Sequence, residues 1–388
     1  MREGWAKKQI KEVSTVVTGT TPSSKDVGNW GGSVPFLTPS DMGAHDYAVI
    51  TSRSLSKESA ERMRNRIISS EATAVVCIGA TIGKVARVTK PTLTNQQINT
   101  IVPTAGKLDP KFSYYVLGSL SEHLFQIASG SATPLLNKSR FENVELILPP
   151  FYEQQQIGKV LGSFDDLIQL NKGIMSQIEQ TLASLFSALE FDTAGPKPIS
   201  LSDLIEVNPK RANPGGIVSF IDMASLPTDS ARVGKVTLRE SGSGSKFMNG
   251  DTIMARITPC LENGKTAFVD VLQDDEIAFG STEFIVLRSR DHIPACWTYF
   301  LARSERFREY AVRHMSGTSG RQRCSAEDIQ NYQISSPSIE KLETFSRHAA
   351  LFSVIKELDE ECQNIIKTRD ELLPLLLSGE ITVKDVVA

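Results

Sequence analysis

Residues 256–269 read RITPCLENGKTAFV, and this stretch decides the fold because a related one occurs earlier, as CIGATIGKVARV in residues 77–88. Both place Gly-Lys after a short polar turn and before an alternating apolar segment, which is typical of a strand that leaves a turn. Gly264-Lys265-Thr266 is also how a nucleotide-binding P-loop ends. That motif needs a glycine where this chain has Pro259, and proline has no N–H to offer a phosphate. We therefore interpret the stretch as a β-hairpin turn that presents a lysine.

The match between the two halves continues on both sides of this turn. Upstream, RIISSEATAVV (66–76) corresponds to KFMNGDTIMA (246–255). Downstream, an aromatic helix followed by a Ser-Gly turn occurs in 109–132 and again in 293–320. A polar cap, a helical turn, a strand and a proline follow in 137–150 and 324–337. Two copies of an α/β domain, each about 190 residues long, are expected to fill the chain.

The lysine of each Gly-Lys turn has two interpretations. Lys84 and Lys265 occupy equivalent positions, so each is a candidate phosphate contact. The alternative is a solvated lysine in a turn.

A long helix is expected after each α/β domain. From Ile157 the apolar residues step by four and three over more than four heptads, which is the pattern of a coiled-coil seam. Asn171 lies within this seam, where a buried polar residue can fix register and partner. Gly195-Pro196 is expected to end the helix. The seam comprises Ile157, Leu161, Phe164, Ile168, Asn171, Met175, Ile178, Leu182, Leu185 and Leu189.

The second seam is more polar, and Pro374 is expected to kink or end its helix. Its positions are Phe345, Ala349, Phe352, Ile355, Asp359, Cys362, Ile366, Arg369, Leu373 and Leu376. A compact domain between the two helices permits them to pair antiparallel and to hold the globular domains apart. The alternative is that each helix packs only on its own domain. The expected fold is α+β, with two pseudo-repeated α/β domains (1–150 and 197–337) and two long antiparallel coiled-coil helices (151–196 and 338–388).

Charge is distributed unevenly along the 388 residues. The net formal charge of the whole chain is −3, but the four segments 1–150, 151–196, 197–337 and 338–388 carry +5, −4, 0 and −4. Electrostatic footprints are local, so this mean charge does not exclude DNA as a partner. The longest apolar runs are shorter than the roughly 18 residues of a membrane span, and MREGWAKKQIKEV has no signal-peptide core. We expect a cytoplasmic protein without a membrane partner.

The sequence offers little catalytic chemistry. The five cysteines form no C-x-x-C pair, and the five histidines form no metal-binding motif, so no metal site is expected. The stretch LPPF (148–151) is similar to the tetrapeptide of adenine methyltransferases, but Leu148 stands where that motif has Asn or Asp. We therefore expect neither a catalytic residue nor a bound cofactor.

Polar residues in the loops of both domains instead indicate a binding surface. Arginine and lysine reach guanine or phosphate, and asparagine and glutamine can read adenine. The candidate DNA-binding residues are Lys25, Trp30, Lys84, Asn95, Gln96, Lys138 and Arg140 in the first half, and Lys210, Arg211, Arg239, Lys246, Lys265, Arg321, Gln322 and Arg323 in the second.

Two α/β domains, each followed by a long helix, make the chain resemble the specificity subunit of type I restriction–modification systems. Its strongest local marks are LPPFYEQQQIGKVLGSFDDLIQLN (148–171) and ELLPLLLSGEI (371–381). The start of the second helix, SSPSIEKLETF, departs from the pattern because it lacks Pro-Pro and the glutamine run.

This resemblance implies that each domain reads one half of a split target in double-stranded DNA. The helices would fix the gap between the halves and dock two methyltransferase subunits, with restriction subunits joining the complex. S-adenosylmethionine, ATP and Mg²⁺ would then bind to the partner subunits. Because the two domains differ strongly in sequence, we expect an asymmetric bipartite target.

Two other classes remain open from the sequence. One is a stand-alone DNA-binding regulator or scaffold that never meets a methyltransferase. The other is a carbohydrate- or peptide-binding repeat protein, which would want aromatic platforms that a chain with 7% aromatic residues offers sparingly.

Overall fold

The computed structural model describes residues 2–43, 47, 49–69, 71–128, 134–190, 199–318, 320–334 and 338–387. The chain forms two compact units. Unit 1 comprises Met1–Leu170 and Cys362–Ala388, and unit 2 comprises Asn171–Glu361. Each unit has its own sheets and its own hydrophobic cores.

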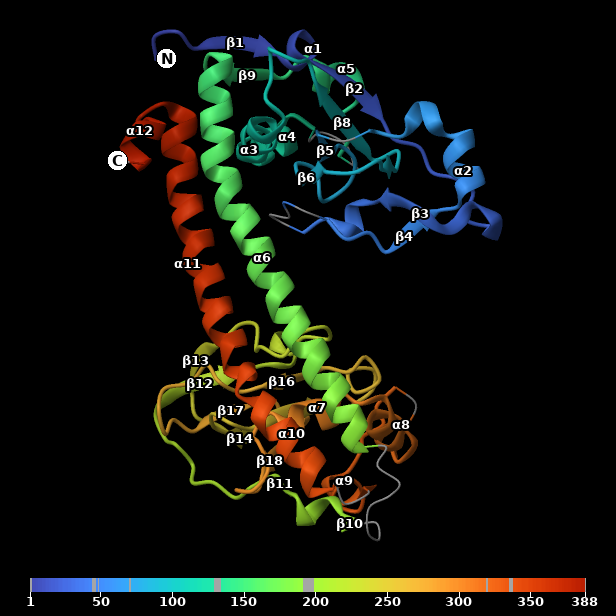
Figure 1. Ribbon diagram of the computed structural model, residues 1–388, viewed down its shortest axis with the longest axis vertical. Helices are drawn as coiled ribbons and strands as arrows, with labels where there is room; N and C mark the ends of the chain where they lie inside the picture. The colour runs from blue at the N-terminus through green and yellow to red at the C-terminus, as the bar shows by residue number, and fades with distance from the viewer. Residues whose placement is uncertain are drawn as a thin grey trace. The chain divides into compact units, whose positions relative to one another are not determined.

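The described residues of unit 1 form three small sheets. Figure 1 labels most of their strands. A four-stranded antiparallel sheet has the order β2 (Ser14–Thr18), β8 (Ile98–Pro103), β5 (Ala72–Val76) and β6 (Val85–Val88). A second sheet has the order β4 (Arg53–Leu55), β3 (Trp30–Leu37) and β7 (Leu93–Thr94), with β3 and β7 parallel. The strands β1 (Ala6–Gln9) and β9 (Glu145–Leu148) form an antiparallel pair.

The helices of unit 1 cover these sheets. Asp109 caps the helix α3 (Pro110–Ser119) by accepting a hydrogen bond from Phe112 N (2.9 Å). Pro110 is the first residue of α3, and its ring fixes φ at a helical value. The buried face of this helix packs on β5 and β6. The short helices are α1 (Ile10–Val13), α2 (Lys57–Arg62), α3 (Pro110–Ser119), α4 (Ser121–Ala128), α5 (Lys138–Glu142) and α12 (Val383–Val387).

Unit 2 also contains three sheets. The antiparallel sheet has the order β11 (Ile205–Val207), β18 (Phe284–Ser289), β15 (Thr252–Ala255) and β16 (Thr266–Phe268). A mixed sheet has the order β13 (Thr237–Glu240), β12 (Ile217–Ile221), β17 (Ala278–Gly280) and β14 (Ser245–Phe247), with β12 and β17 parallel. The strands β10 (Ile199–Ser200) and β19 (Gln333–Ile334) pair antiparallel. The short helices are α7 (Trp297–Arg303), α8 (Glu305–Arg313), α9 (Ala326–Gln330) and α10 (Ile339–Ala349).

The two units have the same strand order in their antiparallel sheets, β2-β8-β5-β6 and β11-β18-β15-β16. A hydroxyl pair joins this sheet to the helix behind it in both units, Thr73 to Ser113 (2.6 Å) and Thr252 to Thr298 (2.8 Å). The mixed α/β class expected from the sequence is confirmed. Unit 2 differs by one additional strand, β14, at the edge of its mixed sheet.

Two long helices, α6 (Phe151–Glu190) and α11 (Leu351–Ser378), contribute residues to both units. In unit 1, Asp165 of α6 bonds to Arg369, and Ile168 O lies 3.9 Å from Cys362 Sγ. In unit 2, Asn171 Nδ2 donates to Glu361 Oε2 (2.9 Å), and the rings of Phe186 and Phe345 are 6.3 Å apart. Residue numbers rise along α6 as they fall along the facing helices, so the pairing inside each unit is antiparallel.

The seam positions predicted from the sequence face the cores. In unit 1, Ile157, Leu161 and Leu376 are at most 1% exposed. In unit 2, Leu182, Phe345 and Phe352 are buried, and Asn171 is buried as a polar seam residue. Among the other seam residues, Ile168 and Ile355 are buried. The partly buried ones are Phe164, Met175, Ile178, Ile366 and Leu373.

The second long helix differs from expectation at both of its ends. It is divided at Ala350 into α10 and α11, and Pro374 lies inside α11, which continues to Ser378. Of the two outcomes expected for Pro374, a kink or an end of the helix, the structure contradicts the end. The predicted stop at Gly195-Pro196, the Ser-Gly turn near 129–132 and the proline at 337 lie outside the described residues.

Candidate nucleic-acid interface

The two Gly-Lys turns hold their lysines inward. Gly83 and Gly264 have φ values of +92° and +71°, which glycine adopts without strain. Lys84 Nζ donates to Met42 O (2.6 Å), and Lys265 Nζ donates to Met223 O (2.8 Å). Both side chains are partly buried. The lysines brace a neighbouring loop. Their role as phosphate contacts stays a prediction, and we leave both residues out of the proposed surface.

In unit 1, one group of candidate residues lies around the loop before β3. Lys25 is exposed there. Asn29 is buried and anchors the loop, because its Nδ2 donates to Ser23 O (3.1 Å) and its Oδ1 accepts from Arg62 (2.6 Å). Trp30 lies under the guanidinium of Arg53, whose Cζ is 3.4 Å from the ring centroid. Sequence reasoning missed Arg53 and Arg62, since they lie far along the chain from this loop.

The turn between β7 and β8 adds amide side chains to this group. Asn95 is only 8% exposed. Its Oδ1 accepts from Gln97 N (3.0 Å), and its Nδ2 donates to Gln97 Oε1 (3.1 Å). Gln96 is exposed and accepts a hydrogen bond from the Thr21 hydroxyl. Asn95 therefore shapes the turn, and its role as a base-reading residue stays a prediction, while Gln96 is available at the surface.

A second group in unit 1 lies on α5, which packs against α1 and β2. Asn137 caps this helix by accepting from Arg140 N (2.9 Å). Lys138 and Arg140 are exposed; Lys138 Nζ is 3.6 Å from a Glu142 carboxylate oxygen, and Arg140 donates to Ile127 O. Both keep exposed cationic groups and stay predictions as DNA contacts.

In unit 2, a pocket of about 500 Å³ gathers Lys210, Arg211 and Lys246 with Asn208 and Ser245. Lys210 is exposed and Lys246 is half-buried. Arg211 is different, because its side chain is 7% exposed and its guanidinium is 2.9 Å from the fully buried carboxylate of Asp251. Burial lowers the pKa of Arg211, and the nearby Asp251 carboxylate opposes that shift.

Arg211 is therefore an anchor of the pocket wall, and its contact with DNA stays a prediction. A charge that is paired and buried in this way is costly to pull away. Arg288 also contacts Asp251, with Nε 3.3 Å from the carboxylate. Arg239 is exposed on β13, where its Cζ lies 3.9 Å from the ring centroid of Phe220, so it stays a predicted contact.

A third cationic group lies at residues 321–323. Arg321 is exposed, and Gln322 and Arg323 are partly exposed. Arg323 binds Glu283 in a forked arrangement, with Nε 2.9 Å from both carboxylate oxygens and Nη2 2.6 Å from Oε1. The Arg323 hydrogen bonds hold the pKa of Glu283 below its usual value, and Arg256 adds to the effect. Sequence reasoning missed Glu283, which lies 40 positions before its partner.

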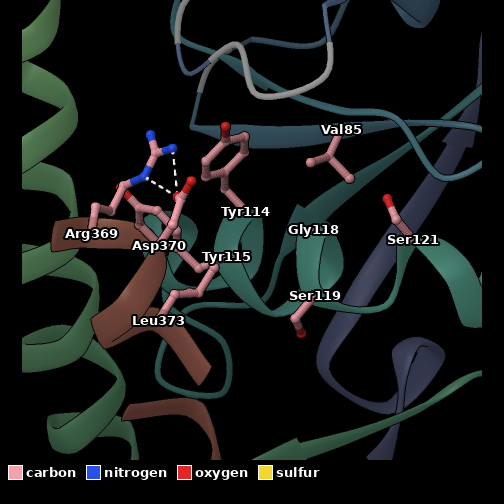
Figure 2. A pocket seen from close by; sticks show the side chains of 9 residues that line it. All are labelled: Val85, Tyr114, Tyr115, Gly118, Ser119, Ser121, Arg369, Asp370 and Leu373. Carbon is pink, nitrogen blue, oxygen red and sulfur yellow. Dashed lines mark hydrogen bonds and ion pairs between the residues drawn. The ribbon is translucent and has the colours of Figure 1, made fainter. Parts of the chain in front are cut away.

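Unit 1 also has a pocket of about 340 Å³ beside its paired helices (Figure 2). Tyr114 and Tyr115 of α3 and Leu373 of α11 line it, and Asp370 accepts two hydrogen bonds from Arg369. Tyr115 also donates to Asp165 of α6. These contacts join α3 to both long helices within unit 1.

The described part of the chain contains no group of three or more His, Cys, Asp or Glu side chains placed to hold a metal ion. Among the same residues, no helix is long and apolar enough to cross a membrane. What the exposed loops offer is cationic, amide and aromatic side chains, which is chemistry suited to binding phosphate and base edges.

The fold and these loops define a two-unit α/β protein with paired long helices and polar recognition loops. Residues 2–180 match the family model described as "Type I restriction modification DNA specificity domain". Residues 2–180 are thus similar to this family, and the resemblance found in the sequence is confirmed.

Individual relatives agree. The chain is 34% identical over 186 residues to the type I restriction enzyme MjaIX specificity subunit of Methanocaldococcus jannaschii, covering 47% of this chain and 43% of that protein. It is 35% identical over 149 residues to the HindI specificity subunit of Haemophilus influenzae, covering 38% and 32%. The chain thus matches less than half the length of these two curated relatives.

A crystal structure of a type I restriction–modification system S subunit from M. genitalium has a similar fold. Its TM-score is 0.60 at 14% sequence identity, and the alignment covers 96% of both chains. This likeness concerns the fold alone.

Proposed function

We propose that the chain is a DNA-binding specificity subunit that reads a split, asymmetric target with two recognition domains, residues 1–150 and 197–337. The observation that carries the proposal is the shared strand order of the two units. A specificity domain is matched in residues 2–180, and the antiparallel sheet of unit 2, which has the same strand order, lies outside that match. This supports two recognition domains in one chain.

The exposed side chains divide into two physical roles. Lys25, Lys138, Arg140, Lys210 and Arg239 supply the charge that draws the protein to the phosphate backbone, and this affinity falls as salt rises. Amide groups and Arg323 supply base-edge contacts, and each good pair contributes about 1–3 kcal/mol of discrimination. Trp30, Lys246, Gln96, Arg321 and Gln322 complete the proposed surface.

The long helices are proposed to set the gap between the two half-sites. Antiparallel contacts inside each unit support this role, because they tie α6 to its facing helices at several points. Linking two weak half-site contacts through a stiff connection raises the effective concentration of the second contact.

The methyl transfer itself is proposed to belong to other polypeptides. Two methyltransferase subunits would dock on the helices, and restriction subunits would join through that complex. S-adenosylmethionine, ATP and Mg²⁺ would bind on those partners, and this chain would act without its own catalytic group. The helix segments 151–196 and 338–388 each carry a net charge of −4, which suits cationic partner surfaces.

The test is base-resolved mapping of adenine methylation in a naive host that expresses the chain with a type I methyltransferase subunit that forms a complex with it. We expect methylation in both halves of one split motif. A matched host with the methyltransferase alone should lack that motif. A stable complex that adds no methylation would contradict the proposal and would favour a stand-alone DNA-binding regulator.

A further inference from the structure

The turn that precedes β8 in unit 1 has the same hydrogen bonds as the turn that precedes β18 in unit 2. In unit 1, Ile98 N donates to Asn95 O (3.1 Å), and Gln97 N donates to the side-chain oxygen of Asn95 (3.0 Å). In unit 2, Phe284 N donates to Ser281 O (3.2 Å), and Glu283 N donates to the Ser281 hydroxyl oxygen (3.1 Å). Gln97 and Glu283 therefore occupy the same position of the same turn.

A second set of backbone contacts fixes what lies beside this position. In unit 1, Cys77 N donates to Gln97 O (2.7 Å), and Leu136 N donates to Cys77 O (2.8 Å). In unit 2, Arg256 N donates to Glu283 O (3.0 Å), and Cys324 N donates to Arg256 O (2.9 Å).

An isolated bridge follows these contacts in each unit, Ile78 with Leu135 and Ile257 with Arg323. Leu135 therefore corresponds to Arg323. Gln97 and Leu135 of unit 1 thus occupy the positions that Glu283 and Arg323 occupy in unit 2.

In unit 2, this place holds an arginine whose orientation is fixed. Glu283 takes the Nε and Nη2 edge of Arg323, and Nη1 donates to Arg321 O (3.2 Å). A guanidinium has five N–H groups, and these bonds use the one on Nε, one on Nη1 and one on Nη2. One N–H group is therefore left on each of Nη1 and Nη2. The Arg323 side chain is 43% exposed, which leaves this end of the fork accessible to a ligand.

In unit 1, the same place holds a fixed amide and an apolar side chain. Asn95 Nδ2 donates to Gln97 Oε1 (3.1 Å), which uses one of the two lone pairs on that oxygen. Within the part of the chain that the structure describes, the Gln97 amide keeps its N–H donors and one acceptor site. Leu135 is 46% exposed although it is a large apolar residue.

We propose that these two equivalent places are the base-reading positions of the two domains, with Arg323 reading a guanine and Gln97 reading an adenine. The proposal rests on the proposed function and deepens it. The two outer N–H groups of Arg323 match guanine O6 and N7, and the Gln97 amide matches adenine N6 and N7. Leu135 lies beside Gln97 to contact the methyl group of thymine. Glu283 and Asn95 are positioning residues that hold the reading side chains.

The test is adenine-methylation mapping with the full chain and its methyltransferase subunit, comparing wild type with Arg323→Ala, Arg323→Lys and Gln97→Leu. We expect Arg323→Ala to reduce discrimination at one guanine of one half-site by about 10- to 100-fold, with the other half-site unchanged. Gln97→Leu should relax one adenine in the other half-site. Arg323→Lys keeps the charge but loses the fork, so it should relax the same guanine even if the alanine variant folds poorly.

The positioning role of Glu283 has its own readout. Glu283→Gln should relax that same guanine in the wild-type background and add nothing in the Arg323→Ala background, because both changes act on one contact. A residue with a merely structural role would lower overall methylation at both half-sites equally. Arg313→Ala on α8, which is exposed and paired with Glu309, is the matched control and should leave the motif unchanged.

The possible results separate the two proposals. A wild-type chain that directs no motif would overturn the proposed function, and this inference with it. A wild-type motif that keeps the same preferences in Arg323→Lys would overturn this inference alone. So would relaxation at a base other than guanine, or relaxation by Arg323→Lys and Gln97→Leu within the same half-site.

Discussion

The guanidinium of Arg369 in α11 donates a hydrogen bond to the carboxylate of Asp165 in α6, and the two side chains are only 6% and 3% exposed. Tyr115 of α3 donates to the same carboxylate. Burial raises the pKa of Asp165, while the hydrogen bond from Tyr115 and the charge of Arg369 oppose that rise. This ion pair ties both long helices to the α/β part of unit 1.

Removing one partner of this pair should destabilise unit 1 strongly. Asp165→Asn removes the buried counterion of Arg369 and leaves only the more exposed carboxylate of Asp370 beside it. Breaking a buried ion pair costs about 3–5 kcal/mol. Urea unfolding of the full chain measures the loss. The double variant Asp165→Leu/Arg369→Met should recover most of it, because an apolar pair of similar volume removes the desolvation cost. A double variant as unstable as the single one would contradict this account.

Lys84 and Lys25 should respond differently to substitution. Lys84→Met keeps the buried stem but removes the hydrogen bond to Met42 O, so it should lower the free energy of unfolding by about 1.5 kcal/mol. It should leave the salt dependence of DNA binding unchanged. Lys25→Ala should leave stability unchanged and reduce the slope of log affinity against log salt by about 1. Equal slopes for the two variants would show that the assignment of roles is wrong.

Phe186 should be a main support of unit 2. It is 2% exposed, and its ring lies 5.3 Å from that of Trp297 and 6.3 Å from that of Phe345. Phe186→Ala should cost about 3–5 kcal/mol, because it leaves a cavity among these rings. Ser187→Ala, an exposed position on the same helix, is the control for helix propensity. The comparison of their urea midpoints measures the difference.

The buried thiols should make stability fall in mildly alkaline solution. Burial raises the pKa of Cys77 to about 11, and of Cys296 and Cys324 to about 12. An unfolded cysteine has a pKa of about 8.5. Between these values the unfolded chain releases thiol protons that the folded chain keeps. The unfolded state then binds fewer protons, so the free energy of unfolding decreases as pH rises from about 8.5 to 11.

Urea unfolding between pH 8 and 10 measures this dependence. Cys77→Ala should make the decrease shallower by up to about 1.4 kcal/mol per pH unit. Ser187→Ala, at an exposed position of α6, removes no titratable group and should leave the slope unchanged. An identical slope for wild type and Cys77→Ala would argue against this origin of the pH dependence.

The gap in the proposed target should follow the length of the paired helices. Inserting one heptad in α6 after Lys172 and one in the facing helix before Glu360 adds about 10 Å of helix, the rise of about three base pairs. Methylation mapping should return both half-sites with a longer gap. An insertion in α6 alone is the control and should disrupt the pairing. Unchanged spacing in the double insertion would refute the spacer role.

The sequence predicted well which face of each long helix is buried, but it predicted poorly which side chains bond to one another. Ile157, Leu161 and Leu182 could be assigned to a core because a helical repeat is written in adjacent residues. The inward lysine Lys84 could not, since its acceptor, Met42 O, lies 42 positions away. Arg211 looked like an exposed loop cation, but its partner Asp251 lies 40 positions further along the chain.

The same reason explains the residues that sequence reasoning left out. Asp165 follows the helical pattern as an ordinary polar residue, and only the fold brings Arg369 to it from 204 positions away. Glu283 has no local motif, and its importance depends on Arg323. A repeat in the sequence identified equivalent turns, but the backbone hydrogen bonds were needed to align Gln97 with Glu283.

Unit 1 is assembled from two stretches that are separated by the whole of unit 2. A ribosome releases Asn171–Glu361 before it releases Leu376, a residue of the unit 1 core with no exposed surface. Domains generally fold as units during synthesis, from the N-terminus onward. Here that order is reversed, because the unit that is translated first waits for the last segment of the chain. Until then Ile157 and Leu161 lack their partners on α11, so the nascent chain depends on a late closing step to protect its first-made surface from aggregation.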